Sequence, residues 1–360
     1  MNGNTIGARV QSRSNYFTAI RIFLAACVAL SHCWIVFSGR ESPDPFAFRD
    51  LTLSYMAVNG FFVLSGFFIA KSLHDRRDLL SYAWSRFLRI MPALAVIALS
   101  AVFLIGPLAS GMPVRAALAD PDTYAYPLNV LSFVDTRGGP PGFAPDNPYK
   151  GEFAGTLWTL RYEALAYIGA GAAFATGLVF RKGPILIVAG ASAALFIVLT
   201  RTGTPAFLPE SIWVLTRFMT AFLIGCAAYV WRDHIPLRLD MALLLTLPLL
   251  VIDGRAESEI IATVALGYWI FLAGAAPRKN LKWLTSVDDI SYGLYIWHWP
   301  VMQILLWRSV VDQPLHMALT AIPISALIAY VSWRLIEKPA LSLKGFSGRF
   351  RKPVVHVQSV

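Results

Sequence analysis

Tyr16–Phe37 reads YFTAIRIFLAACVALSHCWIVF, an apolar segment long enough to cross a lipid bilayer. Arg21 and His32 interrupt it, although an ionisable group at membrane depth costs a few kcal/mol. Chains accept that cost mainly where the group faces a bundle interior or a watery cavity. The two residues are eleven positions apart, about three helical turns plus roughly 20°, so they share one helix face about 16 Å apart along the axis. One helix therefore presents a cation near one membrane face and an imidazole near the other.

The composition of the whole chain is that of a membrane protein. Of its 360 residues, 56% are hydrophobic and only 14% are charged, whereas a soluble domain carries about 25% charged residues. The mean hydropathy is +0.57. No cleavable signal peptide is evident, because no small-residue cleavage site follows the first apolar segment. Cys27, Cys33 and Cys226 lie in apolar segments without a C-x-x-C pair, so we expect small core residues and neither disulfides nor a metal site.

Apolar segments of spanning length recur along the chain and predict an all-α, polytopic membrane bundle of about ten transmembrane helices. The predicted spans lie near 17–37, 51–72, 90–109, 157–179, 184–200, 211–230, 239–253, 259–276, 289–308 and 316–335. The count of ten includes the segment at 239–253, which is shorter than the other predicted spans.

The net charge of +10 reflects topology and does not point to nucleic acid, because the basic residues are concentrated between spans. Most of them fall on the side that holds the N-terminus, so the positive-inside rule predicts that both termini are cytoplasmic. Arg21 then lies toward the cytoplasm and His32 toward the outside. We expect a multi-pass protein of the cell inner membrane.

The predicted domain organisation is one transmembrane domain, residues 1–340, followed by a basic cytoplasmic tail, 341–360, suited to anionic lipid. One connection, 110–155 on the outside, is long and rich in Pro, Gly, Asp and Asn. Two interpretations are open, an ordered functional loop and a solvated tether.

Span four begins T-L-W-T-L-R-Y-E and brings Arg161, Tyr162 and Glu163 in from the outer surface. Glu163 lies about two turns deep, at roughly the predicted depth of His32. A carboxylate beside an imidazole fixes its tautomer and raises its basicity. Alternatively, Glu163 pairs with Arg161 or with Arg217, which also enters from the outer side.

Spans two and nine carry further polar residues. In span two, V-N-G-F-F-V-L-S-G-F, the glycines favour close helix packing, and Ser65 lacks the G-x-S-x-G setting of a nucleophile. In span nine, Ser291 and Tyr295 share a face, and His298 lies about 13 Å into the membrane beside Pro300, which breaks the local hydrogen-bond ladder. His298 is either functional or held by packing and a backbone bond.

Arg86 and Arg89 are one turn apart in the predicted inner loop and form a cationic pair suited to phosphate, although topology alone also places arginines there. Together with Arg21 and His32 they suggest group transfer across the bilayer. A phosphate-bearing donor docks on the three arginines, and neutral His32 takes the proton of an acceptor hydroxyl, which attacks a thioester.

These residues match a known family. The chain resembles the acyltransferase-3 family of multi-spanning membrane acyltransferases from Tyr16 to Pro339. The matching motifs, in order, are Arg21-x10-His32, F-F-V-L-S-G-F, Arg86-x-x-Arg89-x-x-Pro92, L-W-T-L-R-Y-E ending at Glu163, S-Y-G-L-Y-I-W-H-W-P ending at Pro300, and I-E-K-P at Ile336–Pro339. Each is short, but six in this order are specific.

The resemblance implies an O-acyltransferase that moves an acyl group, usually acetyl, from cytoplasmic acyl-CoA to a glycan or glycolipid hydroxyl. It implies His32 as the catalytic histidine and Arg21, Arg86 and Arg89 as CoA-side residues, with acetyl-CoA as donor substrate and no tightly bound cofactor. The chain shows no SGNH-type extracytoplasmic domain, so direct transfer is the simpler expectation. Arg161 departs from the family, where a small residue or proline is more usual before Tyr-Glu. Homo-oligomerisation is left open.

Three alternatives compete with this hypothesis. Intramembrane charges also mark a transporter or flippase of a glycolipid or acyl group, although no repeated halves are visible. A second alternative keeps acyl transfer but changes the group to succinyl or propionyl. The third alternative, a purely structural membrane protein, gives no function to the buried Arg, His and Glu residues.

Overall fold

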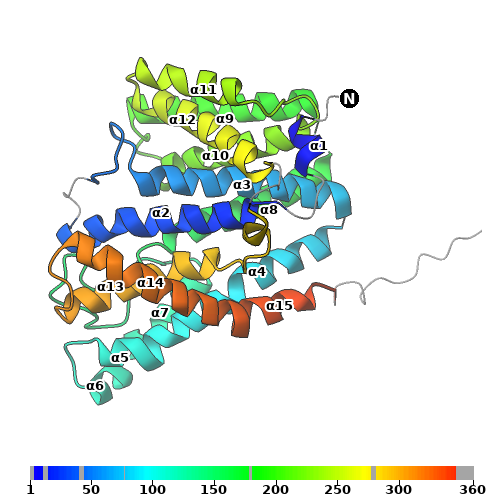
Figure 1. Ribbon diagram of the computed structural model, residues 1–360. Coiled ribbons are helices and arrows are strands. Elements are labelled where there is room, and N and C mark those ends of the chain that lie inside the picture. Colours follow the sequence, from blue (N-terminus) through cyan, green and yellow to red (C-terminus); the bar gives the residue numbers. More distant parts are fainter. Residues whose placement is uncertain are drawn as a thin grey trace, which may run out of the picture.

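The computed structural model describes residues 4–10, 15–39, 44–76, 78–177, 181–276 and 281–345. Within these ranges the chain is helical and forms no β-strand beyond three isolated bridges, which confirms the predicted all-α class. Long helices lie side by side in one bundle (Figure 1). Much of the predicted tail, 341–360, lies outside the described residues.

The α-helices are α1 (Ile6–Val10), α2 (Phe17–Ser38), α3 (Leu53–Arg76), α4 (Leu79–Ser100), α5 (Gly106–Leu108), α6 (Val114–Ala119), α7 (Pro121–Leu131), α8 (Trp158–Thr176), α9 (Lys182–Thr202), α10 (Ser211–Val230), α11 (Leu239–Thr246), α12 (Arg255–Gly274), α13 (Ser291–Trp307), α14 (Pro314–Ser332) and α15 (Lys338–Ser342). Single π-helical turns, Ala101–Ile105 and Trp333–Glu337, join α4 to α5 and α14 to α15. Short 3₁₀ segments follow α11 (Leu247–Leu250) and precede α13 (Lys282–Thr285).

In the described part of the chain, seven helical segments are long and apolar enough to cross a membrane, so the protein is multi-pass. The other three predicted spans coincide with shorter or less apolar helices: α8, α11 with its 3₁₀ extension, and α13. The bundle therefore supports seven spans, and the count of ten stays a prediction. The membrane side of each end also stays a prediction, so we name the two ends of the bundle the Arg21 end and the His32 end.

Two features of the helices differ from the sequence expectation, namely where α4 begins and whether α13 continues past Pro300. Arg86 and Arg89 do not lie in a loop, because α4 already begins at Leu79, where the Asp78 side chain accepts a hydrogen bond from the Leu80 amide at 3.1 Å. Polar residues can extend a helix beyond its apolar run where a cap satisfies its first amides. Pro300 does not interrupt α13, which continues through it to Trp307, so the missing amide costs one hydrogen bond and no break.

Glycines allow the central helices α3 and α10 to touch backbone to backbone. A Cβ atom on Gly66 would lie 1.9 Å from the Phe222 carbonyl oxygen, and one on Gly225 would lie 2.0 Å from that of Val63. The predicted packing role of the span-two glycines is confirmed for Gly66. Cys27, Cys33 and Cys226 are buried free thiols, as expected of small core residues.

The long connection is packed onto the bundle at its His32 end. It forms α6 and α7, followed by turns in which Phe143, Ala144, Phe153 and Ala154 are almost fully buried. Its backbone and α13 are tied together by Gln303, whose Nε2 donates to the carbonyl oxygens of Tyr149 (2.6 Å) and Glu152 (2.9 Å). A loop bonded and buried in this way is not a solvated tether, so the ordered interpretation is the correct one.

Candidate functional site

Helix α2 lies beside α13, and its two ionisable residues contact that stretch of chain at two levels. Near the start of α2, Arg21 forms an ion pair with Asp289, two residues before α13 begins, with 3.5 Å between Nη1 and Oδ2. Near its end, Nδ1 of His32 lies 2.9 Å from Nε2 of His298. The shared helix face predicted from the spacing of Arg21 and His32 therefore meets α13 and the residues preceding it.

A carboxylate that the sequence reasoning missed organises the arginines. Asp289 accepts from Arg89 at 2.9 Å as well as pairing with Arg21, and Ser291 Oγ donates to its other oxygen at 2.6 Å. Burial alone raises the pKa of the Asp289 carboxyl, but Arg89, Arg21 and the Ser291 hydrogen bonds outweigh it and lower the pKa to about 2. The sequence did hold a signal for this carboxylate, because Asp289 lies two residues before the S-Y-G-L motif of span nine.

A cavity of about 550 Å³ extends from this cluster into the bundle. Arg21, Arg86 and Arg89 line it, as do Ser65 and Glu163 farther along the chain. The guanidinium carbon of Arg86 lies 5.6 Å from the centre of the Tyr167 ring, and in the described residues Arg86 forms no ion pair. The three arginines predicted to contact the donor therefore surround one cavity, together with a single carboxylate partner.

Beyond the cavity lies the histidine pair. The rings of His32 and His298 are nearly parallel, 27° apart, and meet edge to edge through this N···N contact with centroids 5.2 Å apart, and His298 Nδ1 lies 3.0 Å from the Leu294 carbonyl oxygen. His298 is fully buried, whereas His32 is partly exposed. Neither lines the cavity, whose walls include Phe61 and Tyr295, one turn before His298. The ring centroid of Tyr295 lies 6.0 Å from that of Phe61 and 6.1 Å from that of His298, so Tyr295 links the cavity wall to the histidine pair.

The predicted partnership of Glu163 with His32 is wrong. Glu163 accepts a hydrogen bond from the hydroxyl of Tyr167, one turn along α8, and lines the cavity. In the part of the chain that the structure describes it contacts neither His32, Arg161 nor Arg217. The two residues were matched by depth alone, and depth does not determine which neighbour a helix face meets.

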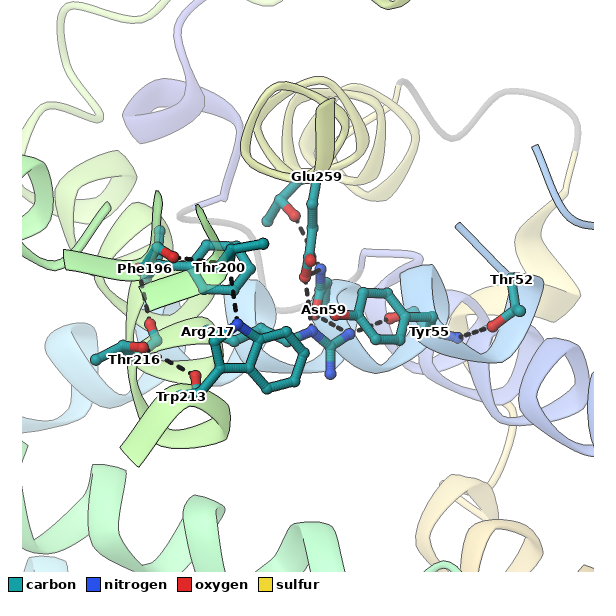
Figure 2. A network of polar contacts seen from close by, with 11 residues as sticks. Thr52, Tyr55, Asn59, Phe196, Thr200, Trp213, Thr216, Arg217 and Glu259 are labelled. Atoms are coloured by element: carbon teal, nitrogen blue, oxygen red, sulfur yellow. Dashed lines mark hydrogen bonds and ion pairs between the residues drawn. The ribbon is translucent and has the colours of Figure 1, made fainter. Parts of the chain in front are cut away.

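Arg161 and Arg217 each have another role. Arg161 donates to the backbone oxygens of Phe133 (2.7 Å) and Val134, so it anchors the long connection to α8. Arg217 forms a buried ion pair with Glu259 at 2.6 Å and donates to Asn59 at 2.9 Å (Figure 2). This network joins α3, α10 and α12 near the His32 end.

The remaining candidates are mainly structural. Tyr162 is buried against Trp158 and Phe218. Tyr295 shares a hydrogen bond of 2.7 Å with Thr159 Oγ1, which ties α13 to α8 where the cavity is walled. The arrangement as a whole sets a basic, polar cavity at the Arg21 end against an imidazole pair and an ordered connection at the His32 end.

The chain is similar to a known family and to several known proteins. The model of the acyltransferase domain that defines the acyltransferase-3 family matches residues 14–334. The chain is 26% identical over 363 aligned residues to nodulation protein 10 of Rhizobium leguminosarum bv. viciae, covering 92% of this chain and 94% of that protein. It is 23% identical over 338 residues to the O-acetyl transferase of Shigella phage Sf6, with 92% and 97% coverage.

A longer relative matches the chain over about half of its own length. The peptidoglycan O-acetyltransferase of Listeria monocytogenes is 23% identical over 339 residues, which cover 82% of this chain and 53% of that protein. No solved structure matches the chain.

Proposed function

Because the chain belongs to the acyltransferase-3 family and is an O-acyltransferase, we propose that it moves an acetyl group from cytoplasmic acetyl-CoA to a hydroxyl of a glycan or glycolipid outside the membrane. In this proposal the Arg21 end faces the cytoplasm, in accord with the bias of basic residues, and the membrane is the inner membrane. The observation that carries the proposal is the arginine-lined cavity, whose wall residue Tyr295 has its ring 6.1 Å from that of His298, the hydrogen-bond partner of His32.

The Arg21 end suits the phosphates of CoA. Among the described residues, the cavity is lined by four basic side chains, those of Arg21, Arg86, Arg89 and Lys344, and by two acidic ones, those of Glu163 and Asp289, which leaves a net positive charge. Arginine binds phosphate through paired, charge-assisted hydrogen bonds, and Arg86 is the cation whose charge Asp289 does not compensate. The narrower pantetheine arm then extends along the cavity toward Tyr295.

The reacting end requires a short passage. The thioester passes the aromatic rings of Phe61 and Tyr295 and meets the acceptor hydroxyl beside His32. His32 takes the hydroxyl proton, the oxygen attacks the thioester carbonyl carbon, and the C–S bond breaks as the ester forms. The imidazolium returns its proton to the CoA thiolate, which leaves as the thiol.

The relatives support acetyl as the group and a glycan as the acceptor. One is named O-acetyl transferase and another peptidoglycan O-acetyltransferase. The proposal therefore assigns acetyl rather than succinyl or propionyl.

The test uses the full chain purified into lipid nanodiscs with radiolabelled acetyl-CoA and a glycolipid extract from the producing cells. We expect acetyl esters on the glycan, CoA release, and at least a hundredfold loss of both in a His32→Ala variant. His316→Ala, which changes an exposed histidine on α14, is the matched control. Full activity of His32→Ala would overturn the proposed base, and glycolipid movement without use of acetyl-CoA would establish the transporter alternative.

A further inference from the structure

His298 donates its Nδ1 proton to a backbone carbonyl, and this single contact determines the rest of the histidine pair. The oxygen of Leu294, 3.0 Å away, can only accept a hydrogen bond, so Nδ1 of His298 is the protonated nitrogen. In a neutral imidazole the other nitrogen, Nε2, then carries the lone pair. That nitrogen is the one 2.9 Å from His32.

The same argument applies once more at His32. Because Nε2 of His298 accepts, Nδ1 of His32 donates, and Nε2 of His32 is left with its lone pair. In the described residues Nε2 of His32 forms no hydrogen bond, and His32 is partly exposed. From this chain of contacts we propose that His298 is a positioning residue that holds His32 in the tautomer able to accept a proton at Nε2.

The choice of a second imidazole has a physical reason. A carboxylate in this position would place another charge in a setting of low dielectric constant, whereas neutral His298 adds none. When His32 accepts the acceptor's proton, its Nδ1–H bond to His298 strengthens because the donor is now charged. The Leu294 carbonyl stabilises the same charge from the far side of His298, and return of the proton restores the neutral pair.

The ring orientation is also determined. His298 is fully buried, its ring is hydrogen-bonded edge to edge with that of His32, and Trp299 meets His32 edge-on with centroids 5.2 Å apart. A base held in one orientation and one tautomer has its lone pair directed at one place. This inference rests on the proposed role of His32 as general base.

Nitrogen-15 NMR of the purified protein at pH 8, with labelled histidine, tests the tautomer directly. The His32 signals are identified by their absence from a His32→Ala variant. We expect Nδ1 of His32 to be protonated and Nε2 to show the shift of an unprotonated ring nitrogen. In His298→Leu we expect both tautomers of His32. A protonated Nε2 in the unaltered protein would overturn the proposal whatever the variants do.

Kinetics test the consequence. In His298→Leu we expect kcat to fall about a hundredfold, as for loss of a correctly positioned base, with KM for acetyl-CoA changed less than about twofold. His298→Gln places an amide oxygen near the position of Nε2, so we expect it to recover kcat to within about tenfold of the unaltered enzyme. His316→Gln is the control for a histidine at the same end of the bundle.

Two outcomes separate this inference from the proposed function. An active His32→Ala enzyme would overturn the general base and this inference with it. An inactive His32→Ala enzyme beside a fully active His298→Leu enzyme would overturn the positioning role alone. Thermal unfolding in detergent shows whether His298→Leu is folded, and if it is not, a folded His298→Gln that loses kcat as far as His32→Ala does would overturn the proposal.

Discussion

At the scale of single residues, the Arg21 end depends on one carboxylate that pairs with two of the three arginines lining the cavity. Asp289 pairs with Arg21 and Arg89, and this holds both guanidinium groups at the cavity wall. Arg86 lies against the Tyr167 ring instead and lines the same cavity. The two types of arginine should therefore respond differently to substitution.

Arg86→Gln should raise KM for acetyl-CoA with little change in kcat. A charge-assisted hydrogen bond contributes about 1.5–3 kcal/mol, which corresponds to a rise in KM of roughly tenfold to a hundredfold. Steady-state kinetics with acetyl-CoA measure it, and Arg115→Gln, on exposed helix α6, is the control. An unchanged KM would show that Arg86 does not contact the donor.

Asp289→Asn should destabilise the fold in a pH-dependent manner. The folded-state pKa of about 2 lies below the unfolded value of about 4, so the carboxylate contributes stability above pH 4 and loses it as pH falls through 2. The difference in unfolding free energy from the unaltered protein should be about 2 kcal/mol at pH 7 and should disappear toward pH 2. Chemical unfolding in detergent across this range measures it.

Asp253→Asn is the control for that experiment, since Asp253 pairs with Arg49 but its side chain is 91% exposed. An exposed pair contributes within about 1 kcal/mol. An Asp289→Asn difference that did not change with pH would contradict the assignment of a strongly lowered pKa.

At the scale of elements, the bundle relies on two kinds of contact between helices. Close backbone contact at Gly66 and Gly225 brings α3 against α10. A buried polar network then joins this pair to α12 through Arg217, Glu259 and Asn59 (Figure 2). The first contact depends on the absence of side chains and the second on complete pairing of charge.

Arg217→Met should destabilise the bundle by about 3–5 kcal/mol, because it leaves the Glu259 carboxylate buried without its cation. The double variant Arg217→Met with Glu259→Leu should recover most of that loss, since removing both charges also removes their desolvation cost. Unfolding midpoints in detergent measure both. If the double variant were no more stable than the single one, the ion pair would stabilise the contact between α10 and α12 by its own attraction. The loss in Arg217→Met would then not come from leaving Glu259 unpaired.

At the scale of the whole molecule, the two ends of the bundle are built for different tasks. The Arg21 end opens into a basic cavity, and the His32 end is covered by the connection between α7 and α8, tied down by Gln303 and Arg161 (Figure 1). Arg161 is the residue that departs from the family pattern, and its bonds to the connection give it a structural role in this chain. In the proposed reaction, the connection packed at this end limits the access of water to the thioester.

Gln303→Leu should loosen that cover. It removes the two bonds that Gln303 donates to the backbone oxygens of Tyr149 and Glu152 and the one it accepts from Asn147, together about 1.5–4.5 kcal/mol, so the open population should rise about tenfold or more. Limited proteolysis of the connection should accelerate accordingly, and acetyl-CoA hydrolysis should rise relative to transfer. Gln313→Leu, at an exposed glutamine of the same end, is the control. Equal cleavage rates in the two variants would contradict the role given to Gln303.

The sequence by itself determined the helices, their membrane character, the family and the helix face shared by Arg21 and His32, because each follows from local periodicity, apolar length or motif order. Only the tertiary structure decided the partners: Asp289 for the arginines, His298 and not Glu163 for His32, Glu259 for Arg217, and a backbone anchor for Arg161. Periodicity gives the depth and the face of a residue within its own helix. Which face of a neighbouring helix it meets is set by how the helices rotate and pack against one another, and that information is distributed over the whole bundle.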